Sequence, residues 1–208
     1  MYSDVVPTTG KQHRKAISRG RKLEYFTIAW NSIEALIAVV AGALAGSVSL
    51  VGFGADSFIE VVSGSALLWR MSVGQENPKR IRRERIALKI VSFCLLALAL
   101  YISVESIEAL VHAKKPEASI IGIVLACGSL IIMPFLSHFK RKVAYQLDSA
   151  AMHADARQTQ FSLYLSGILL VGLIANAVLG WWWADPLCAL AMVPLIAKEG
   201  LDNLAGKA

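Results

Sequence analysis

Two acidic residues interrupt an apolar stretch that is long enough to cross a lipid bilayer. The stretch runs from Ser47 to Arg70, and Asp56 and Glu60 lie near its middle. On a helix, residues four apart face the same side one turn apart, so the two carboxylates point into one small volume. A charged carboxylate at the bilayer centre costs about 2.5 to 3.5 kcal/mol on insertion scales, so it has to face other helices. We expect this pair to bind a cation inside a helix bundle; the alternative is a pair merely satisfied by a neighbouring Arg or hydroxyl.

The chain as a whole is apolar and contains six such stretches. Hydrophobic residues occupy 56% of its 208 positions, against about 45–50% in soluble domains. Each stretch is near or above the ~20 residues that a helix needs to cross the hydrocarbon core. The stretches are 25–45, 48–72, 86–111, 118–138, 145–178 and 184–200. We predict an all-α membrane protein with a six-helix transmembrane domain at 23–200, a basic cytoplasmic N-terminal tail at 1–22 and a short cytoplasmic tail at 201–208.

The positions of the basic residues predict the orientation of the bundle. The net charge of +6 is concentrated in the N-terminal tail and in the second-to-third and fourth-to-fifth connections. These connections hold Lys79, Arg80, Arg82, Arg83, Arg85, Lys140, Arg141 and Lys142. By the positive-inside rule, they and both termini are cytoplasmic, and we expect the protein in the inner (plasma) membrane. The orientation of the protein in the membrane explains the basic residues, so we expect no nucleic-acid partner. The N-terminus lacks the apolar core of a removable signal peptide.

A run of three tryptophans marks the opposite, outer interface. Trp181–Trp183 fall at the entrance of the sixth stretch, where indole rings favour headgroup depth, so we interpret them as membrane anchors. Asp185 and Pro186 follow directly, which fits a helix start with Asp185 as its N-cap. Glu105 and Glu108 lie near the outer end of the third stretch, where a carboxylate reaches water.

The fifth stretch carries a second group of polar residues. At helical spacing Asp155, Gln158 and Ser162 share one face, whereas His153 and Arg157 share another. The first face offers oxygen donors, and the second carries potential positive charge. The helical rise places Asp155 and Gln158 near the middle of the membrane, at a depth similar to that of the acid pair.

These two polar groups predict a divalent-metal site between the second and fifth helices. The residues assigned to the metal are Asp56, Glu60, Asp155 and Gln158. Additional metal ligands or proton-relay groups are Asn31, Glu34, His153 and Ser162. Asn31 and Glu34 equally fit neutralising a positive partner, and His153 equally fits packing on the other face of its helix. A catalytic nucleophile and a multi-histidine cluster are absent from the sequence, so we expect neither catalytic residues nor a catalytic cofactor, and the protein is predicted not to be an enzyme.

Four motifs together resemble those of one known family. They are TIAWNSIEA, SVSLVGFGADSFIE, SAAMHADARQTQFSLYLSG and WWWADPLCALAM. The chain resembles the cation diffusion facilitators, six-span transporters that export zinc and related divalent ions, over about residues 20 to 200. The resemblance implies a tetrahedral metal site built from one pair of residues on the second helix and a His/Asp pair on the fifth. The first pair falls on Asp56 and Glu60, and the second falls on Gln158 and Ser162.

The resemblance also implies a mechanism and a substrate class. It implies export of a divalent metal ion by alternating access with proton antiport, with the lipid bilayer, the metal ion and protons as partners. Zinc is the metal expected from the family, with cobalt and cadmium as further candidates, but an oxygen-rich site suits manganese or iron better. The family's cytoplasmic C-terminal domain is not found here, so we expect a homodimer to be held by the transmembrane helices. The alternative function is a non-transporting metal-binding regulatory subunit of the membrane.

Overall fold

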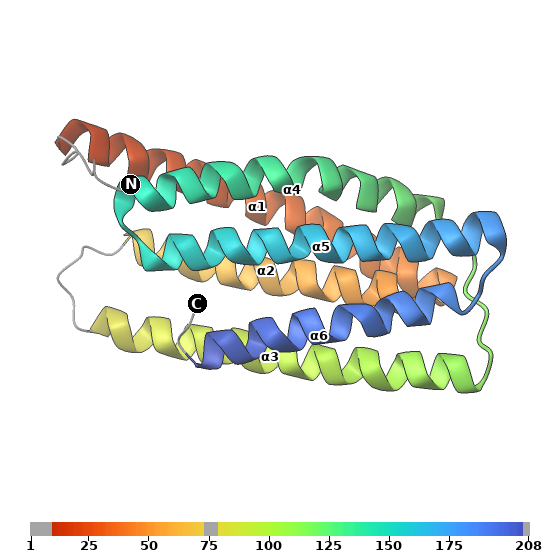
Figure 1. Cartoon of the computed structure of the whole chain (residues 1–208). Helices are drawn as coiled ribbons and strands as arrows, with labels where there is room; N and C mark the ends of the chain where they lie inside the picture. Colours follow the sequence, from red (N-terminus) through yellow and green to blue (C-terminus); the bar gives the residue numbers. More distant parts are fainter. Residues whose placement is uncertain (1–9, 73–78, 206–208) are drawn as a thin grey trace, which may run out of the picture.

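The protein folds as one bundle of six long helices (Figure 1). The computed structural model describes residues 10–72 and 79–205, and the side chains of 10–12, 70–72, 79–88 and 150–151 lie outside that description. The helices are α1 (Gly10–Ala45), α2 (Val48–Ser72), α3 (Lys79–Val111), α4 (Ile120–Leu147), α5 (Ala150–Leu179) and α6 (Ala184–Leu204). The predicted all-α six-helix bundle is confirmed. The basic side chains predicted at 79–85 lie outside what is described, and so do residues 1–9 and 206–208 of the two predicted tails.

Five of the six helices are long and apolar enough to cross a membrane, and α6 falls short of that criterion. The reason is its charge content, because Asp185, Lys198, Glu199 and Asp202 all lie within its 21 residues. Large apolar side chains are exposed along the outside of the other helices, as expected for a surface that faces lipid. Examples are Leu36, Phe93, Leu100, Ile120, Val124, Val171 and Val178.

Tight connections fold the chain into antiparallel pairs. Gly46, with φ of 66°, joins α1 to α2, and a side chain would strain that left-handed backbone. Asp148, with φ of 45°, ends α4, and the hydroxyl of Ser149 then caps α5 by accepting a hydrogen bond from the backbone N–H of Met152. The third closely packed pair is α3 with α6, which lie side by side in Figure 1.

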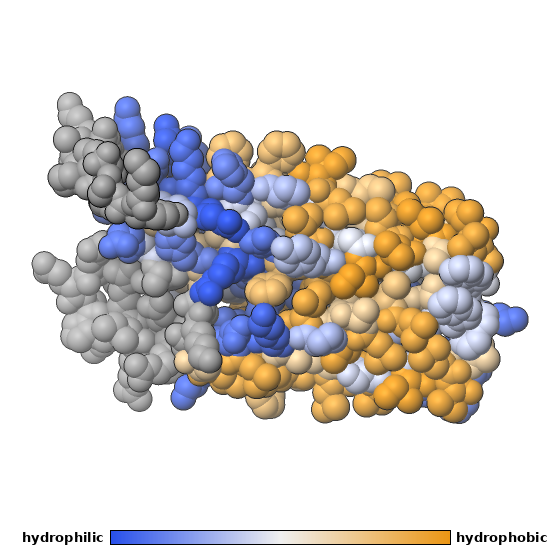
Figure 2. Space-filling view, in the orientation of Figure 1, coloured by the Kyte–Doolittle hydropathy of each residue, from blue (hydrophilic) through white to orange (hydrophobic). Residues whose placement is uncertain are grey.

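The two ends of the bundle differ in polarity. The end that we call the basic end contains the α4–α5 turn, and it is hydrophilic in Figure 2. Its described basic side chains are Arg14, Lys15, Arg19, Arg21, Lys22, Arg141 and Lys142. The other end, the tryptophan end, contains the α1–α2 turn and the rings of Trp181 and Trp183, which stack with centroids 5.0 Å apart.

Two glycines bring the backbones of α1 and α2 into direct contact. A Cβ on Gly42 would lie 2.8 Å from the backbone nitrogen of Val51, and one on Gly54 would lie 2.9 Å from that of Val39. Close approach through small residues is the usual way in which membrane helices associate, because lipid provides no hydrophobic drive between them. The contact holds the polar face of α1 against the acid pair of α2.

Asp185 does not cap its own helix, which corrects the sequence prediction. The N-cap of α6 is Trp183, which makes no side-chain capping bond. The carboxylate of Asp185 instead accepts hydrogen bonds from the Ser47 hydroxyl at 2.6 Å, from the backbone N–H of Val48 at 2.9 Å and from the Ser49 hydroxyl. We call this arrangement the Asp185 clamp. It satisfies the free N–H groups at the start of α2 with a carboxylate from α6, so the two helices are joined at the tryptophan end.

Candidate metal-binding site

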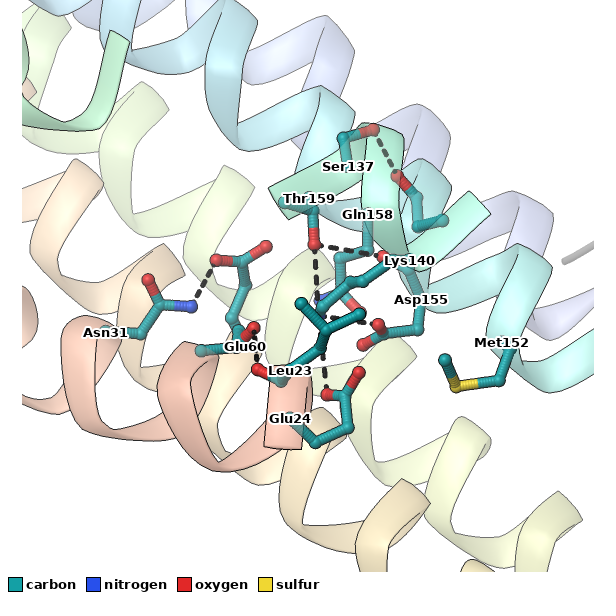
Figure 3. Close-up of polar contacts among 12 residues, drawn as sticks. Leu23, Glu24, Asn31, Glu60, Ser137, Lys140, Met152, Asp155, Gln158 and Thr159 are labelled. Carbon is teal, nitrogen blue, oxygen red and sulfur yellow. Dashed lines mark hydrogen bonds and ion pairs between the residues drawn. The ribbon is translucent and has the colours of Figure 1, made fainter. Parts of the chain in front are cut away.

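The acid pair of α2 faces the interior of the bundle. Asp56 and Glu60 are 2% and 4% exposed, and each is hydrogen-bonded to a different neighbouring helix. The Ser162 hydroxyl of α5 donates to Oδ2 of Asp56 at 3.2 Å. The Asn31 amide of α1 donates to Oε2 of Glu60 at 2.5 Å (Figure 3). The pair therefore lies where α1, α2 and α5 meet, away from lipid, as its spacing predicts.

A third carboxylate, that of Glu34, lies in the same region. It is 1% exposed and accepts hydrogen bonds from the Ser57 hydroxyl at 2.9 Å and from the Ser129 hydroxyl of α4. The bonds described for Glu34 thus come from neutral groups. We define the acid-pair cluster as Asn31, Glu34, Asp56, Ser57, Glu60, Ser129 and Ser162.

The predicted face of α5 is the buried one. Asp155, Gln158 and Ser162 are 8%, 7% and 3% exposed. The side-chain nitrogen of Gln158 is buried and has no hydrogen-bond partner among the described residues. His153 is only half-buried, and its ring packs edge-on against Tyr145 with centroids 4.6 Å apart. Of the two interpretations of His153, the structure favours packing on the other face of the helix.

Asp155 is paired with Lys140 of α4, a residue that the sequence predicts in a cytoplasmic connection. That prediction is wrong for Lys140, because α4 continues to Leu147 and the Lys140 side chain is fully buried. Its ammonium lies 2.6 Å from Oδ2 of Asp155 and 3.3 Å from Oε2 of Glu24, and it donates to the Thr159 hydroxyl at 3.3 Å (Figure 3). We call Glu24, Lys140, Asp155 and Thr159 the lysine cluster. A buried ammonium is stable only with such partners, because each ion pays a desolvation cost of several kcal/mol.

Helical spacing in the sequence indicates the residues of this cluster. Met133, Leu136, Lys140 and Ala144 follow one another at spacings of three or four, so Lys140 lies on the buried face of α4. The same spacing extends the polar face of α1 from Glu34 and Asn31 back through Thr27 to Glu24, and all four are buried. Helical spacing identifies these residues, whereas proximity to a charged segment does not.

The predicted metal residues are only partly brought together. Asp56 contacts Ser162, Glu60 contacts Asn31, and Asp155 lies against Lys140. Within residues 10–72 and 79–205, no three His, Cys, Asp or Glu side chains are gathered closely enough to hold a metal ion. The assignment of metal ligands therefore stays a prediction. The donors around the acid pair are carboxylate, amide and hydroxyl oxygens, which suit hard or borderline divalent ions.

Comparison with known proteins identifies relatives of this bundle. Residues 25–205 match the family described as the cation efflux transmembrane domain. The chain is 23% identical over 192 residues to the manganese efflux system protein MneS of Bacillus subtilis, covering 89% of this chain and 66% of that protein. It is 27% identical over 163 residues to the cation-efflux pump FieF of Klebsiella pneumoniae (76% and 54% covered). It is also 27% identical over 169 residues to the magnetosome protein MamB of Magnetospira sp. (78% and 57% covered). The chain spans between half and two thirds of the length of these relatives.

Proposed function

The chain belongs to the family of cation efflux transmembrane domains, and we propose that it carries a divalent transition-metal ion out of the cytoplasm. The observation that carries this proposal is the buried pair Asp56 and Glu60, whose described hydrogen-bond partners are the neutral groups of Ser162 and Asn31. Two carboxylates buried in a membrane bundle need positive charge, and a divalent ion supplies it. The proteins similar to this chain are named as efflux systems and pumps, which supports transport over enzymatic activity.

The metal ligands proposed are Asp56 and Glu60, with Gln158 and Ser162 facing them from α5. Asp155 joins them only when it leaves Lys140. This donor set consists of oxygen atoms, so it favours Mn²⁺ or Fe²⁺ over Zn²⁺, which prefers nitrogen and sulfur. The name of the similar protein MneS, a manganese efflux system, points in the same direction.

Proton antiport follows from the same chemistry. A carboxylate has to lose its proton before it binds a metal ion, so protons and metal compete for one set of oxygens. A bundle that opens the site alternately to each side then exchanges protons from outside for metal from inside. The proposal includes a cytoplasmic basic end, an inner-membrane location and a homodimer formed by the transmembrane helices. The asymmetry of basic charge between the two ends supports that orientation.

Reconstituted vesicles test the proposal. The purified protein is placed in liposomes that contain a Mn²⁺-sensitive dye, and uptake is recorded with and without a pH gradient. We expect wild-type flux that depends on the gradient and falls at least tenfold in Asp56→Asn. Glu108→Gln is the matched control, because Glu108 is exposed and pairs with Lys114 at the tryptophan end. Equal flux in wild type and Asp56→Asn contradicts the proposal, and metal binding without flux favours the regulatory subunit instead.

A further inference from the structure

Glu199 of α6 is a further buried carboxylate, outside the lysine cluster and the acid-pair cluster. It is 6% exposed, and its Oε1 atom is buried without a hydrogen-bond partner in the described part of the chain. A carboxylate is rarely buried in this way unless it is paired, protonated or bound to a metal ion. The buried carboxylate of Glu199 therefore needs a partner.

The side of α6 that carries Glu199 faces the centre of the bundle. Met192, Ile196 and Glu199 are spaced by four and three residues, so they share one face. Met192 and Ile196 are 0% and 1% exposed and belong to the central hydrophobic core. The next residue, Gly200, faces α3 instead, since a Cβ there would lie 3.1 Å from Cγ of Leu96. Successive residues are about 100° apart around a helix, so Glu199 is offset from that contact with α3. The helices α5 and α2 also pack against α6.

The Asp185 clamp places Glu199 at the depth of the acid pair. Both α2 and α6 run from the tryptophan end to the basic end, and the clamp fixes Ser47 beside Asp185. At about 1.5 Å per residue, Glu60 lies roughly 20 Å below Ser47, and Glu199 lies roughly 21 Å below Asp185. The charges of Asp56 and Glu60 act electrostatically on Glu199, which agrees with their similar depth in the bundle.

We propose that Glu199 is a cation-binding residue of the transport site, a third carboxylate that α6 adds to Asp56 and Glu60. This inference rests on the proposed function. The three carboxylates do not surround one point in the present conformation, as expected for like charges, which repel one another. A divalent ion between the three carboxylates attracts each of them and so offsets that repulsion. The three rotatable bonds of the Glu199 side chain allow its carboxylate to move toward the ion.

Glu199 also has a consequence for metal choice. Three carboxylates with the amide of Gln158 and the hydroxyl of Ser162 form a site of oxygen donors alone, which Mn²⁺ accepts more readily than Zn²⁺. The third negative charge takes the place of the fifth-helix aspartate expected from the resemblance, where this chain has Ser162. Glu199 therefore acts as a specificity-determining ligand as well as a source of affinity.

The test compares binding of Mn²⁺ and Zn²⁺ by titration calorimetry on the purified full chain, with vesicle flux as a second measurement. In Glu199→Gln, which keeps the shape and loses the charge, we expect Mn²⁺ affinity to fall on the order of 10- to 100-fold. We expect Zn²⁺ affinity to fall less, so that the Zn²⁺/Mn²⁺ preference rises. Glu199→Asp should recover part of the Mn²⁺ affinity. Asp202→Asn, on the same helix but only half-buried, is the matched control and should resemble wild type.

The outcomes separate the inference from the proposed function. If wild type binds and transports Mn²⁺ and Glu199→Gln has the same affinity and metal preference, the inference is overturned and the proposed function stands. If wild type neither binds nor transports a divalent ion, the proposed function fails and the inference fails with it. Should Glu199→Gln not fold, the preference of Glu199→Asp decides, because a purely structural Glu199 leaves the Zn²⁺/Mn²⁺ ratio at the wild-type value.

Discussion

The lysine cluster and the acid-pair cluster bury carboxylates in the same bundle, but they balance the charge differently. In the lysine cluster, the Lys140 ammonium lies 2.6 Å from an oxygen of Asp155 and 3.3 Å from one of Glu24. In the acid-pair cluster, the described hydrogen bonds to the carboxylates come from the amide of Asn31 and from serine hydroxyls. The lysine cluster thus contains a cation in direct ion pairs, whereas the hydrogen bonds of the acid-pair cluster come from neutral donors and Lys140 acts on Glu60 only from outside that cluster.

This difference assigns different roles to the two clusters. A cation that is covalently part of the chain is always present, so the lysine cluster joins α1, α4 and α5 through a permanent ion pair. Neutral donors hold a carboxylate in position without cancelling its charge, so under the proposed function the acid-pair cluster takes its positive charge from mobile ions. Buried acids therefore identify a transport site only when the chain does not neutralise them itself.

The largest predicted effect comes from placing a fixed cation in the acid-pair cluster, because this change removes the difference between the two clusters. In Ser162→Lys an ammonium replaces the hydroxyl that lies 3.2 Å from Asp56. It should pair with Asp56 as Lys140 pairs with Asp155, and we expect Mn²⁺ flux to fall by roughly 100-fold or more because a fixed charge occupies the site of the mobile one. Ser162→Ala is the control for the lost hydroxyl: it removes one proposed ligand without adding a charge, so its loss of flux should be clearly smaller than that of Ser162→Lys. Wild-type flux in a folded Ser162→Lys protein would contradict the comparison.

The reverse change removes the cation from the lysine cluster. Lys140→Met keeps the length of the side chain but leaves Glu24 and Asp155 without their positive partner. We expect unfolding in detergent to become easier by about 3 to 5 kcal/mol, the usual cost of breaking one side of a buried ion pair. Lys142→Met is the matched control, since Lys142 is exposed and only two residues away. If the two variants unfold alike, the ion pair of Lys140 contributes nothing to stability.

The smallest predicted effects come from removing one neutral hydroxyl group from each cluster. Thr159→Val in the lysine cluster and Ser57→Ala in the acid-pair cluster each remove one hydroxyl bonded to a charged group. Each should cost about 1 kcal/mol in the free energy of unfolding. Only Ser57→Ala should also change Mn²⁺ affinity, by less than tenfold, because Ser57 orients Glu34 beside the acid pair. Parallel calorimetry on both variants checks this, and an equal change in affinity in Thr159→Val would mean that the clusters are not functionally distinct.

The features that sequence predicted well are those set by local spacing. The inward direction of Asp56 and Glu60 follows from four-residue spacing within an apolar stretch, and so does the buried face of Asp155, Gln158 and Ser162. These predictions need only the geometry of a single helix and the cost of exposing charge to lipid. The all-α bundle follows for the same reason, since backbone groups in lipid are satisfied within each helix.

The features that sequence missed depend on contacts between distant segments. Asp185 is a residue type that commonly caps helices. Only the bundle shows that the helix it caps is α2, which begins at Val48, 137 positions away in the chain. Lys140 adjoins Arg141 and Lys142, so it looks like one more orientation charge, although its side chain is fully buried. Glu199 lies between Lys198 and Asp202 near the polar end of α6 and looks interfacial in the same way. In each case the partner is chosen by packing between helices.

The Asp185 clamp restricts how the bundle is able to move. While its hydrogen bonds to Ser47, Val48 and Ser49 persist, the starts of α2 and α6 stay at a constant separation. Relative rotation of these two helices is then largest at their far ends, beyond Glu60 and Glu199. If the proposed site opens alternately to each side, opening at the tryptophan end would tilt α2 and α6 together, whereas opening at the basic end would change the angle between them.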